Sequence, residues 1–388
     1  MNPKCYPASL QVNGGPIHSG GEWSGFVAFD APGLTLEQLE QVARYYYGLG
    51  YGYLCPTMVT ASEEAYRSNL PVFLKARDYA WGKGILPPHL EGPFLAPECI
   101  GAHNPALRVD PTVEYAAKLM DWSGGFIGWV TMAAERPGAL EVIRYFAGKG
   151  VSVSLGHQNP TLENIQAGLA AGSTGFTHVL NAATRDKIGV KDLRMIVQFT
   201  DRRAFSMIIS DAIHVPGYAV KLMADGKGPD KVIIVADESP LIGAPPSTTY
   251  QLWGRTFVVR LNEAGEPYTD PLSGSCTSLI GCMNVAIGYG VLRETVERAV
   301  TSNVAAFLKP ALDRFGIRLD EAHVHSGGVV FSDGVYAPER RSFRESCGRG
   351  SRHQHHHPEP SLLRRDQPTS NTCGASCRSC IRPCPRAS

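Results

Sequence analysis

The chain alternates short β-rich runs with longer stretches of helical periodicity from Gln11 to about Lys309. This alternation is typical of βα units packed around a parallel sheet. Strands are expected at residues 10–13, 53–56, 85–89, 126–132, 151–155, 175–178, 205–209 and 232–236. Helices are expected between them at residues 34–47, 63–79, 113–122, 139–148, 162–171, 193–199 and 215–224. Eight strands with intervening helices predict a (β/α)8 TIM barrel, whose active site lies at the carboxyl ends of the strands.

Local signals support these helices. Thr35, Thr112 and Thr161 each precede a helical stretch and are expected to cap it. The alternative fold is an open doubly wound sheet, but no G-x-G-x-x-G follows the first strand to favour it.

The chain changes character after the eighth strand. Residues 240–249 read as a Pro- and Ser-rich loop, 250–261 as a strand and 262–267 as a turn, together an insertion before the last helices. A helix is expected at 293–309 and a short β-like segment at 323–331. From about Tyr336 the sequence has too little apolar surface to fold. The expected domains are a barrel with a residual C-terminal strand at 1–335 and a low-complexity, disordered tail at 336–388.

The net charge and the apolar content of the sequence indicate what kind of molecule the protein binds. The 37 basic and 36 acidic residues leave a formal charge of +1, which gives no reason to expect nucleic acid or an anionic membrane. The sequence has no apolar run of the ~20 residues that a membrane span needs, and the N-terminus lacks a signal-peptide core. A cytoplasmic protein with a small-molecule substrate is therefore expected.

The ten cysteines divide into two groups. Five are scattered through the globular part and are expected to be reduced: Cys5, Cys55, Cys99, Cys276 and Cys282. The tail holds a C-x3-C-x2-C-x3-C pattern (Cys373, Cys377, Cys380 and Cys384) near several histidines. A zinc site is one interpretation of this pattern, and incidental low complexity, favoured by the absence of an apolar framework, is the other.

Polar residues gather where the expected strands end. They are Gln11, Asn13, Thr57, His89, Glu91, His157, His178, Asp211, His214 and Asp237. Because a barrel brings its strand ends to one mouth, these positions are expected to meet there. Two imidazoles and a carboxylate suit a borderline metal such as Zn²⁺ and leave a coordination position for water. The pattern therefore predicts a metal-dependent hydrolase.

Six segments then carry a resemblance to a known family. They are HLEGPFLAPECIGAH (89–103), VSLGHQ (153–158), THVLNAAT (177–184), SDAIHVP (210–216), VADESP (235–240) and LSGS (272–275). In this order they resemble the motifs of the N-acetylglucosamine-6-phosphate deacetylases, which belong to the amidohydrolase superfamily. The resemblance covers most of the barrel, and HLEGPF with a following GAH is its most specific part.

The resemblance implies that Glu91, His157 and His178 bind the metal and that Asp237 is the acid and base. The first strand carries Gln11 and Asn13 and no imidazole, as in the deacetylases that hold a single metal. One divalent ion per active site is expected, Zn²⁺ first, with Fe²⁺ or another ion as alternatives.

The implied reaction is hydrolysis of N-acetyl-D-glucosamine 6-phosphate to D-glucosamine 6-phosphate and acetate. A metal-activated water attacks the acetamide carbonyl, Asp237 accepts its proton and then protonates the departing amine. His103 matches the donor that stabilises the negative charge on the carbonyl oxygen. The residues that match the sugar site are Ala102, Asn181, Ala182, Arg185, His214, Leu272, Ser273 and Gly274.

Two positions keep two interpretations. Arg185, or Lys187 beside it, is expected either to hold the 6-phosphate or to belong to a solvated basic loop, because the loop after Ala182 is shorter than the family's. Asp211 either contacts substrate or caps the segment before His214.

The sequence differs from the family that it resembles in two further ways that affect the expected function. Family members carry a β-sandwich built from both chain ends, which is expected here to be reduced or missing because few residues precede Gln11. The low-complexity tail at 336–388 is the other difference from the family. The competing functions are therefore a deacetylase of another N-acetylated sugar or amino acid and a truncated relative that does not catalyse. Resemblance also suggests a homodimer.

Overall fold

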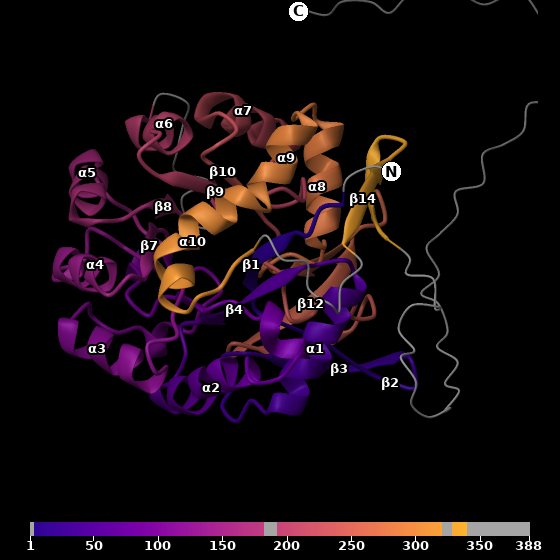
Figure 1. Ribbon diagram of the computed structural model, residues 1–388, viewed down its shortest axis with the longest axis horizontal. Helices are drawn as coiled ribbons and strands as arrows, with labels where there is room; N and C mark the ends of the chain where they lie inside the picture. Colours follow the sequence, from indigo (N-terminus) through magenta and orange to yellow (C-terminus); the bar gives the residue numbers. More distant parts are fainter. Residues whose placement is uncertain (1–3, 182–191, 320–327, 340–388) are drawn as a thin grey trace, which may run out of the picture. The chain divides into compact units, whose positions relative to one another are not determined.

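The computed structural model describes residues 4–181, 192–319 and 328–339. Eight parallel strands follow one another around a single sheet in chain order (Figure 1). They are β1 (Ala8–Val12), β4 (Tyr53–Val59), β5 (His89–Glu91), β6 (Trp129–Met132), β7 (Ser152–Leu155), β8 (Gly175–Phe176), β9 (Phe205–Ile209) and β10 (Val232–Val235). Each of the eight overlaps a predicted run, although β5 shares only His89 with the run predicted at 85–89.

The sheet closes on itself beyond β10. The backbone N of Glu238 donates to the oxygen of Gln11 at 2.8 Å, and the N of Asn13 donates to the oxygen of Glu238 at 3.1 Å. A parallel bridge joins Val12 to Glu238 at this place. The open doubly wound sheet is thereby excluded, and the predicted (β/α)8 barrel is confirmed.

Helices surround the barrel (Figure 1). They are α1 (Leu36–Gly48), α2 (Glu63–Ala76), α3 (Val113–Trp122), α4 (Ala139–Gly148), α5 (Leu162–Ala171), α6 (Leu193–Thr200), α7 (Gly217–Lys227), α8 (Leu279–Gly288), α9 (Arg293–Ala299) and α10 (Ser302–Arg314). None of the described helices has the length and apolar character needed to cross a membrane.

The predicted helix caps are confirmed. The side chain of Thr35 accepts a hydrogen bond from the backbone N of Gln38, and Thr112 and Thr161 do the same for Tyr115 and Asn164. Each bond satisfies a donor in the first helical turn that has no partner within the helix.

Helix α10 covers the amino end of the barrel. The hydroxyl of Ser152, the first residue of β7, donates to the oxygen of Phe307 at 2.6 Å. The Phe307 ring lies against Trp129 and Phe205, which begin β6 and β9. Because this end is closed by α10, the opposite end, where the strands finish, is left to form the site.

The prediction of a single strand at 250–261 was wrong. This segment forms a hairpin of β11 (Thr249–Leu252) and β12 (Arg255–Leu261), to which β13 (Pro267–Asp270) adds a third antiparallel strand. The reversal occurs at Trp253 and Gly254, both of which have positive φ, as a two-residue hairpin turn requires.

Other elements also differ from the prediction. The helix expected at 293–309 is divided into α9 and α10, and α8 was not predicted. The hairpin of β2 (Gly14–Ser19) and β3 (Glu22–Ala28) was missed as well, because its Gly-rich strands have little alternation of apolar and polar residues.

Small sheets stand where a β-sandwich was expected to be reduced or missing. In the described ranges, the strands outside the barrel form a three-stranded sheet and two hairpins, β2–β3 and β14 (Val329–Ser332) with β15 (Val335–Pro338). A bridge links Cys5 to Val329, which ties the C-terminal hairpin to the chain start. β15 runs past residue 335, and the tail predicted at 336–388 lies outside the described residues from 340 onward.

Candidate metal centre and active site

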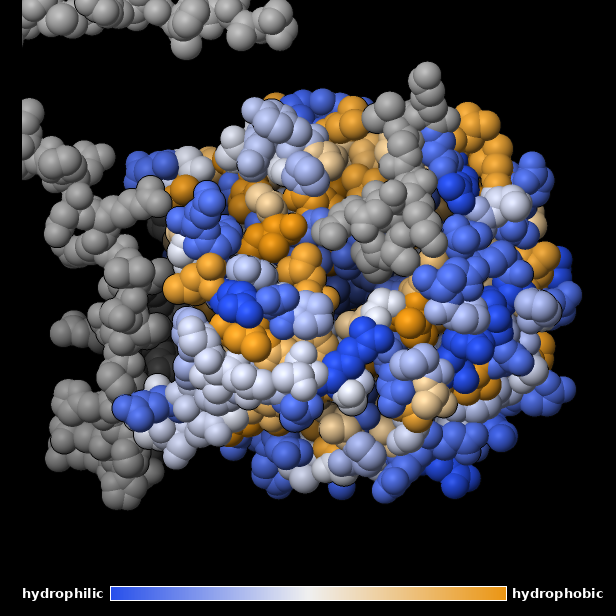
Figure 2. Space-filling model, turned by 180° about the vertical axis from the view of Figure 1, so that it is seen from behind, coloured by the Kyte–Doolittle hydropathy of each residue, from blue (hydrophilic) through white to orange (hydrophobic). Residues whose placement is uncertain are grey.

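A cavity of about 370 Å³ opens at the carboxyl ends of the barrel strands. Figure 2 shows this face of the molecule, with a hollow near its centre between hydrophilic and hydrophobic residues. The predicted site residues that line the cavity are Glu91, Ala102, His103, His157, His178, Asn181, His214, Asp237, Leu272, Ser273 and Gly274. Ala182 and Arg185 lie outside the described residues, as do Lys187 and the tail cysteines.

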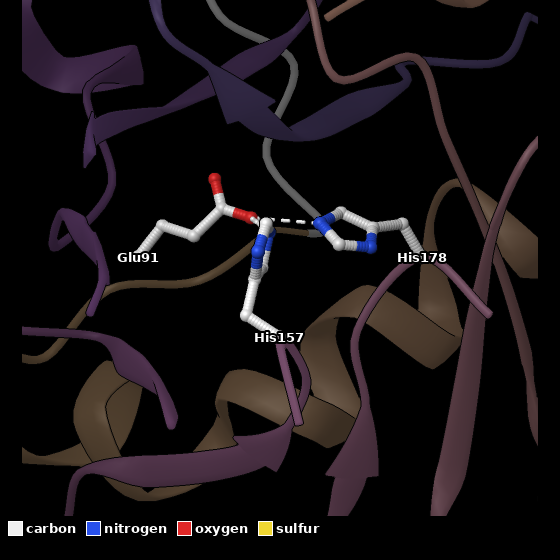
Figure 3. Close-up of side chains that lie close together, drawn as sticks. All are labelled: Glu91, His157 and His178. Atoms are coloured by element: carbon white, nitrogen blue, oxygen red, sulfur yellow. Dashed lines mark hydrogen bonds and ion pairs between the residues drawn. The ribbon is translucent and has the colours of Figure 1, made fainter. Parts of the chain in front are cut away.

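Three side chains converge at the base of the cavity (Figure 3). Glu91 ends β5, and His157 and His178 follow β7 and β8 by two residues. The Nε2 atoms of His157 and His178 lie 3.0 Å and 2.7 Å from the same oxygen, Oε1 of Glu91. One ligand atom from each residue lies within 4.8 Å of the other two, and all three side chains are buried.

This donor set fits a divalent metal. A carboxylate and two neutral imidazoles are ligands that Zn²⁺ accepts, and three protein ligands leave a position for water or substrate. Within the described part of the chain, no other group of three or more His, Cys, Asp or Glu side chains is close enough to hold a metal ion. The sequence prediction of Glu91, His157 and His178 therefore selected residues that the fold brings together.

The backbone is unusual at the ends of these strands. His157, His178 and Asp237 have φ values of 49°, 23° and 55°, a region that non-glycine residues rarely adopt. Such conformations persist only when surrounding structure enforces them, and they concentrate at functional sites. Here each turns the chain sharply where the strand finishes and its side chain enters the cavity.

The tautomer of His157 is set by the loop that follows Glu91. Its Nδ1 lies 2.8 Å from the backbone oxygen of Cys99, which can only accept, so Nδ1 carries the proton. In return, the backbone N of Ala96 donates to the oxygen of His157 at 3.0 Å. In the neutral ring Nε2 then keeps its lone pair, and this atom, which faces Oε1 of Glu91, is the one available to a metal.

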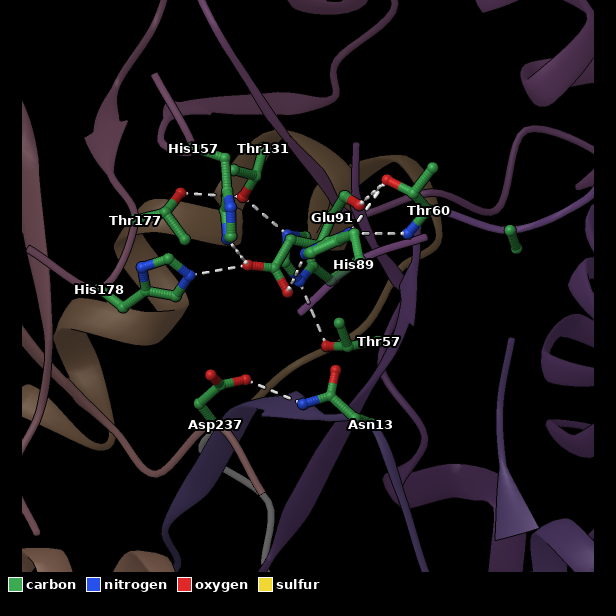
Figure 4. Close-up of polar contacts among 12 residues, drawn as sticks. Asn13, Thr57, Thr60, His89, Glu91, Thr131, His157, Thr177, His178 and Asp237 are labelled. Atoms are coloured by element: carbon green, nitrogen blue, oxygen red, sulfur yellow. Dashed lines mark hydrogen bonds and ion pairs between the residues drawn. The ribbon is translucent and has the colours of Figure 1, made fainter. Parts of the chain in front are cut away.

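Asp237 enters the cavity from the end of β10 and is held by Asn13 at the end of β1. The Asn13 Nδ2 donates to Oδ1 of Asp237 at 2.8 Å (Figure 4). Burial, reinforced by the charge of Glu91, raises the pKa of Asp237 from 3.8 to about 6. A carboxyl whose pKa lies near neutrality can both accept and return a proton in one catalytic cycle.

His103 is arranged as a hydrogen-bond donor. The backbone N of Thr60 donates to its Nδ1 at 3.1 Å, so in the neutral ring Nε2 carries the proton. Burial, with the charge of His157, lowers the pKa of His103 to about 3 and keeps the ring neutral. Its Nε2 lies 4.0 Å from Oε2 of Glu91 and faces the cavity.

His89 also lies on β5, but its side chain packs inside the barrel. Its ring stacks on Trp129 with centroids 3.5 Å apart, and its Nε2 lies 2.8 Å from Oγ1 of Thr131. Oγ1 of Thr131 lies 2.8 Å from Oγ1 of Thr177, so these side chains form a polar network beside the candidate metal ligands (Figure 4). His89 does not line the cavity.

The hydrogen bonds of Asp211 distinguish between its two predicted roles, which are contact with substrate and capping of the segment before His214. Its Oδ1 accepts hydrogen bonds from the backbone N of Ile213 and of His214, at 2.9 Å and 2.8 Å. Its Oδ2 lies 2.7 Å from Nδ1 of His214 and from Oγ of Ser275. The carboxylate caps the segment and orients His214, and it is not among the residues that line the cavity.

The sequence analysis missed one wall of the cavity. Trp253, Arg255 and Phe257, from the β11–β12 hairpin, line it together with the loop at 271–274. Along β12, buried Phe257 and Val259 alternate with more exposed neighbours, although the sequence itself, with apolar Val258 between them, does not alternate. Reading 250–261 as a single strand hid the turn that brings Arg255 to the barrel mouth.

Known proteins similar to this chain were found by sequence and by structure, although no family model matches. The chain is 30% identical over 282 residues to the N-acetylglucosamine-6-phosphate deacetylase of Caenorhabditis elegans. The aligned segment covers 71% of this chain and 66% of that protein. It is 28% identical over 218 residues to the N-acetylgalactosamine-6-phosphate deacetylase of Escherichia coli O157:H7, with 56% of each protein covered. The chain spans less than two thirds of the length of the curated relatives it matches.

The structural comparison extends over more of the chain. The crystal structure of N-acetylglucosamine-6-phosphate deacetylase from Pasteurella multocida superposes with a TM-score of 0.71 at 25% identity, covering 86% of this chain and 83% of that one. The chain is therefore similar, in sequence and in fold, to N-acetylglucosamine-6-phosphate deacetylases.

Proposed function

We propose that this protein hydrolyses the acetamide of N-acetylglucosamine 6-phosphate to glucosamine 6-phosphate and acetate. The observation that carries the proposal is that Glu91, His157 and His178 converge in one cavity with Asp237, whose pKa is raised to about 6. Similarity in sequence and in fold to proteins of this name supports the choice of substrate.

The proposed chemistry assigns a task to each residue. A divalent ion held by Glu91, His157 and His178, for which we propose Zn²⁺ ahead of Fe²⁺, would act as a Lewis acid and lower the pKa of a water in the site. Asp237 takes the proton of the attacking water and later delivers it to the amine that leaves. Asn13, by donating to Oδ1 of Asp237, fixes the orientation of the carboxyl for both transfers.

His103 completes the reacting site. An amide carbonyl gains negative charge as water adds to it, and a donor aimed at that oxygen lowers the barrier. The Nε2–H of His103 faces the cavity and stays protonated because Thr60 occupies Nδ1. Ala102, Asn181, His214, Leu272, Ser273 and Gly274 then form the walls that we propose contact the sugar.

A second candidate is deacetylation of a different N-acetylated compound. The similarity to an N-acetylgalactosamine-6-phosphate deacetylase favours another amino sugar within this alternative. A truncated relative without catalysis is the third candidate. It would not explain why the three candidate metal ligands, Asp237 and His103 lie together in one cavity.

Acetate release tests these candidates. We expect metal-loaded protein to release acetate from N-acetylglucosamine 6-phosphate faster than from the 4-epimer or the unphosphorylated sugar, and Asp237→Asn to lose at least about 10³-fold in kcat. Faster release from the 4-epimer would favour the second candidate. No release from any of them, with metal shown to be bound, would favour the third or an untested amide.

Assembly and location are also proposals. Homodimer formation is inferred from the family resemblance alone, and analytical ultracentrifugation tests it. A cytoplasmic location is supported by Cys5, Cys55, Cys99, Cys276 and Cys282, which are all buried and free, as expected in a reducing compartment.

A further inference from the structure

The β11–β12 hairpin forms one wall of the active-site cavity. Leu252 pairs with Arg255 across a two-residue turn, and both turn residues, Trp253 and Gly254, have positive φ. This geometry matches the twist of the strands and fixes the position of the residue that follows the turn. The turn lies beside the loop of His103, because a Cβ on Gly254 would lie 3.7 Å from Nδ2 of Asn104.

Strand alternation directs Arg255 toward the cavity. Along β12, Arg255 shares a face with Phe257 and Val259, both of which are buried, and Phe257 also lines the cavity. Arg260 lies on the opposite face of the same strand, where its Nε donates to Oδ2 of Asp270 at 2.6 Å. The two arginines of β12 therefore face different surroundings.

Arg255 is a cation that no described residue pairs with. It is exposed, and among the described residues it forms no hydrogen bond or ion pair, whereas Arg260 is paired. It is also the only lysine or arginine among the described residues that line the cavity.

We propose that Arg255 binds the phosphate of the substrate and gives this enzyme its selectivity for a phosphorylated amino sugar. A guanidinium offers two parallel donors that match two phosphate oxygens, and an exposed one loses little hydration when it binds. The proposal rests on the proposed function and deepens it. It assigns to the hairpin the task that the sequence suggested for Arg185.

The test compares the phosphorylated sugar with the unphosphorylated sugar. For metal-loaded wild type, Arg255→Ala, Arg255→Lys and Arg260→Ala, kcat/KM is measured with N-acetylglucosamine 6-phosphate and with N-acetylglucosamine. We expect Arg255→Ala to lower the ratio of the two values about 10- to 100-fold, mostly through KM for the phosphorylated sugar. Arg255→Lys should retain part of the ratio, and Arg260→Ala should keep it within about twofold.

A binding measurement separates this proposal from the proposed function. If the wild type releases no acetate, calorimetric titration with glucosamine 6-phosphate and with glucosamine still reports the phosphate contribution, and Arg255→Ala should weaken only the former. The proposal is overturned if Arg255→Ala leaves the ratio unchanged or lowers both values equally. It is also overturned if Arg185→Ala removes the selectivity while Arg255→Ala preserves it.

Discussion

The phenol of Tyr51 donates a hydrogen bond of 2.9 Å to Oε1 of Glu238, deep beside the seam where β1 meets β10. Ser9 donates to both oxygens of the same carboxyl, at 3.0 Å and 2.8 Å. Burial nevertheless raises the pKa of Glu238 from 4.5 to about 8. The seam that closes the barrel therefore holds a carboxyl that resists ionisation in the folded protein.

This carboxyl should make stability depend on pH. Between about pH 4.5 and 8 the unfolded chain ionises Glu238 while the folded protein keeps its proton, so the free energy of unfolding falls as pH rises, by at most about 1.4 kcal/mol per pH unit. Glu238→Gln should flatten this slope relative to the wild type. Urea unfolding from pH 5 to 8 measures it, with Glu263→Gln in an exposed turn as the control. If the free energy of unfolding changes with pH at the same slope in Glu238→Gln as in Glu263→Gln, Glu238 is ionised in the folded protein.

Removal of the metal should abolish activity and lower stability. We expect about one divalent ion per chain in the wild type and much less in Glu91→Gln, since the carboxyl oxygen lies between both imidazoles. Metal at 100 times its Kd should stabilise the wild type by about 2.7 kcal/mol and the variant hardly at all. Elemental analysis and thermal unfolding measure both, with exposed Glu141→Gln as the control. Full occupancy in Glu91→Gln would place the ion elsewhere.

Asp211 should act on activity through His214. Its carboxylate accepts a hydrogen bond from Nδ1–H of His214, so in the neutral ring Nε2 is an acceptor, and His214 lines the cavity. Asp211→Asn places an amide donor there and should reverse the tautomer, with a fall in kcat/KM of about 10- to 100-fold. Asp225→Asn, in an exposed pair with Lys221, is the matched control. If kcat/KM falls only in proportion to lost folded protein, as measured by circular dichroism, Asp211 has a structural role alone.

Asn69 should be a large contributor to stability. It is fully buried on α2 and accepts from the backbone N of Gly33 and Leu34 while it donates to the oxygens of Phe29 and Ala31. Asn69→Ala removes the side-chain partner of the Leu34 N and of the Phe29 and Ala31 oxygens, whereas the Gly33 N still donates to Oγ of Ser68. The change should cost about 2–4 kcal/mol. Asn159→Ala, at an exposed position, should stay within about 0.5 kcal/mol. Equal unfolding midpoints for the two variants would contradict this account.

The sequence by itself determined the barrel and the centre of the site. Eight β-rich runs separated by helical stretches fit a closed parallel sheet, and that architecture places the ends of distant strands at one mouth. Glu91, His157, His178 and Asp237 could therefore be grouped without coordinates, because each ends a predicted strand or follows one within two residues. The capping threonines were predictable for a similar reason, since a cap depends only on its own helical turn.

The tertiary structure alone decided what depends on neighbours distant in the sequence. Asp211 became a cap and an orienting group because Ser275 and His214 surround it, and His89 became part of the interior because Trp129 lies against its ring. Alternation along β12 shows which residues share a face, but only packing decides which surface that face covers. The position of Arg255 at the cavity thus follows from how the hairpin packs on the barrel, which no local pattern specifies.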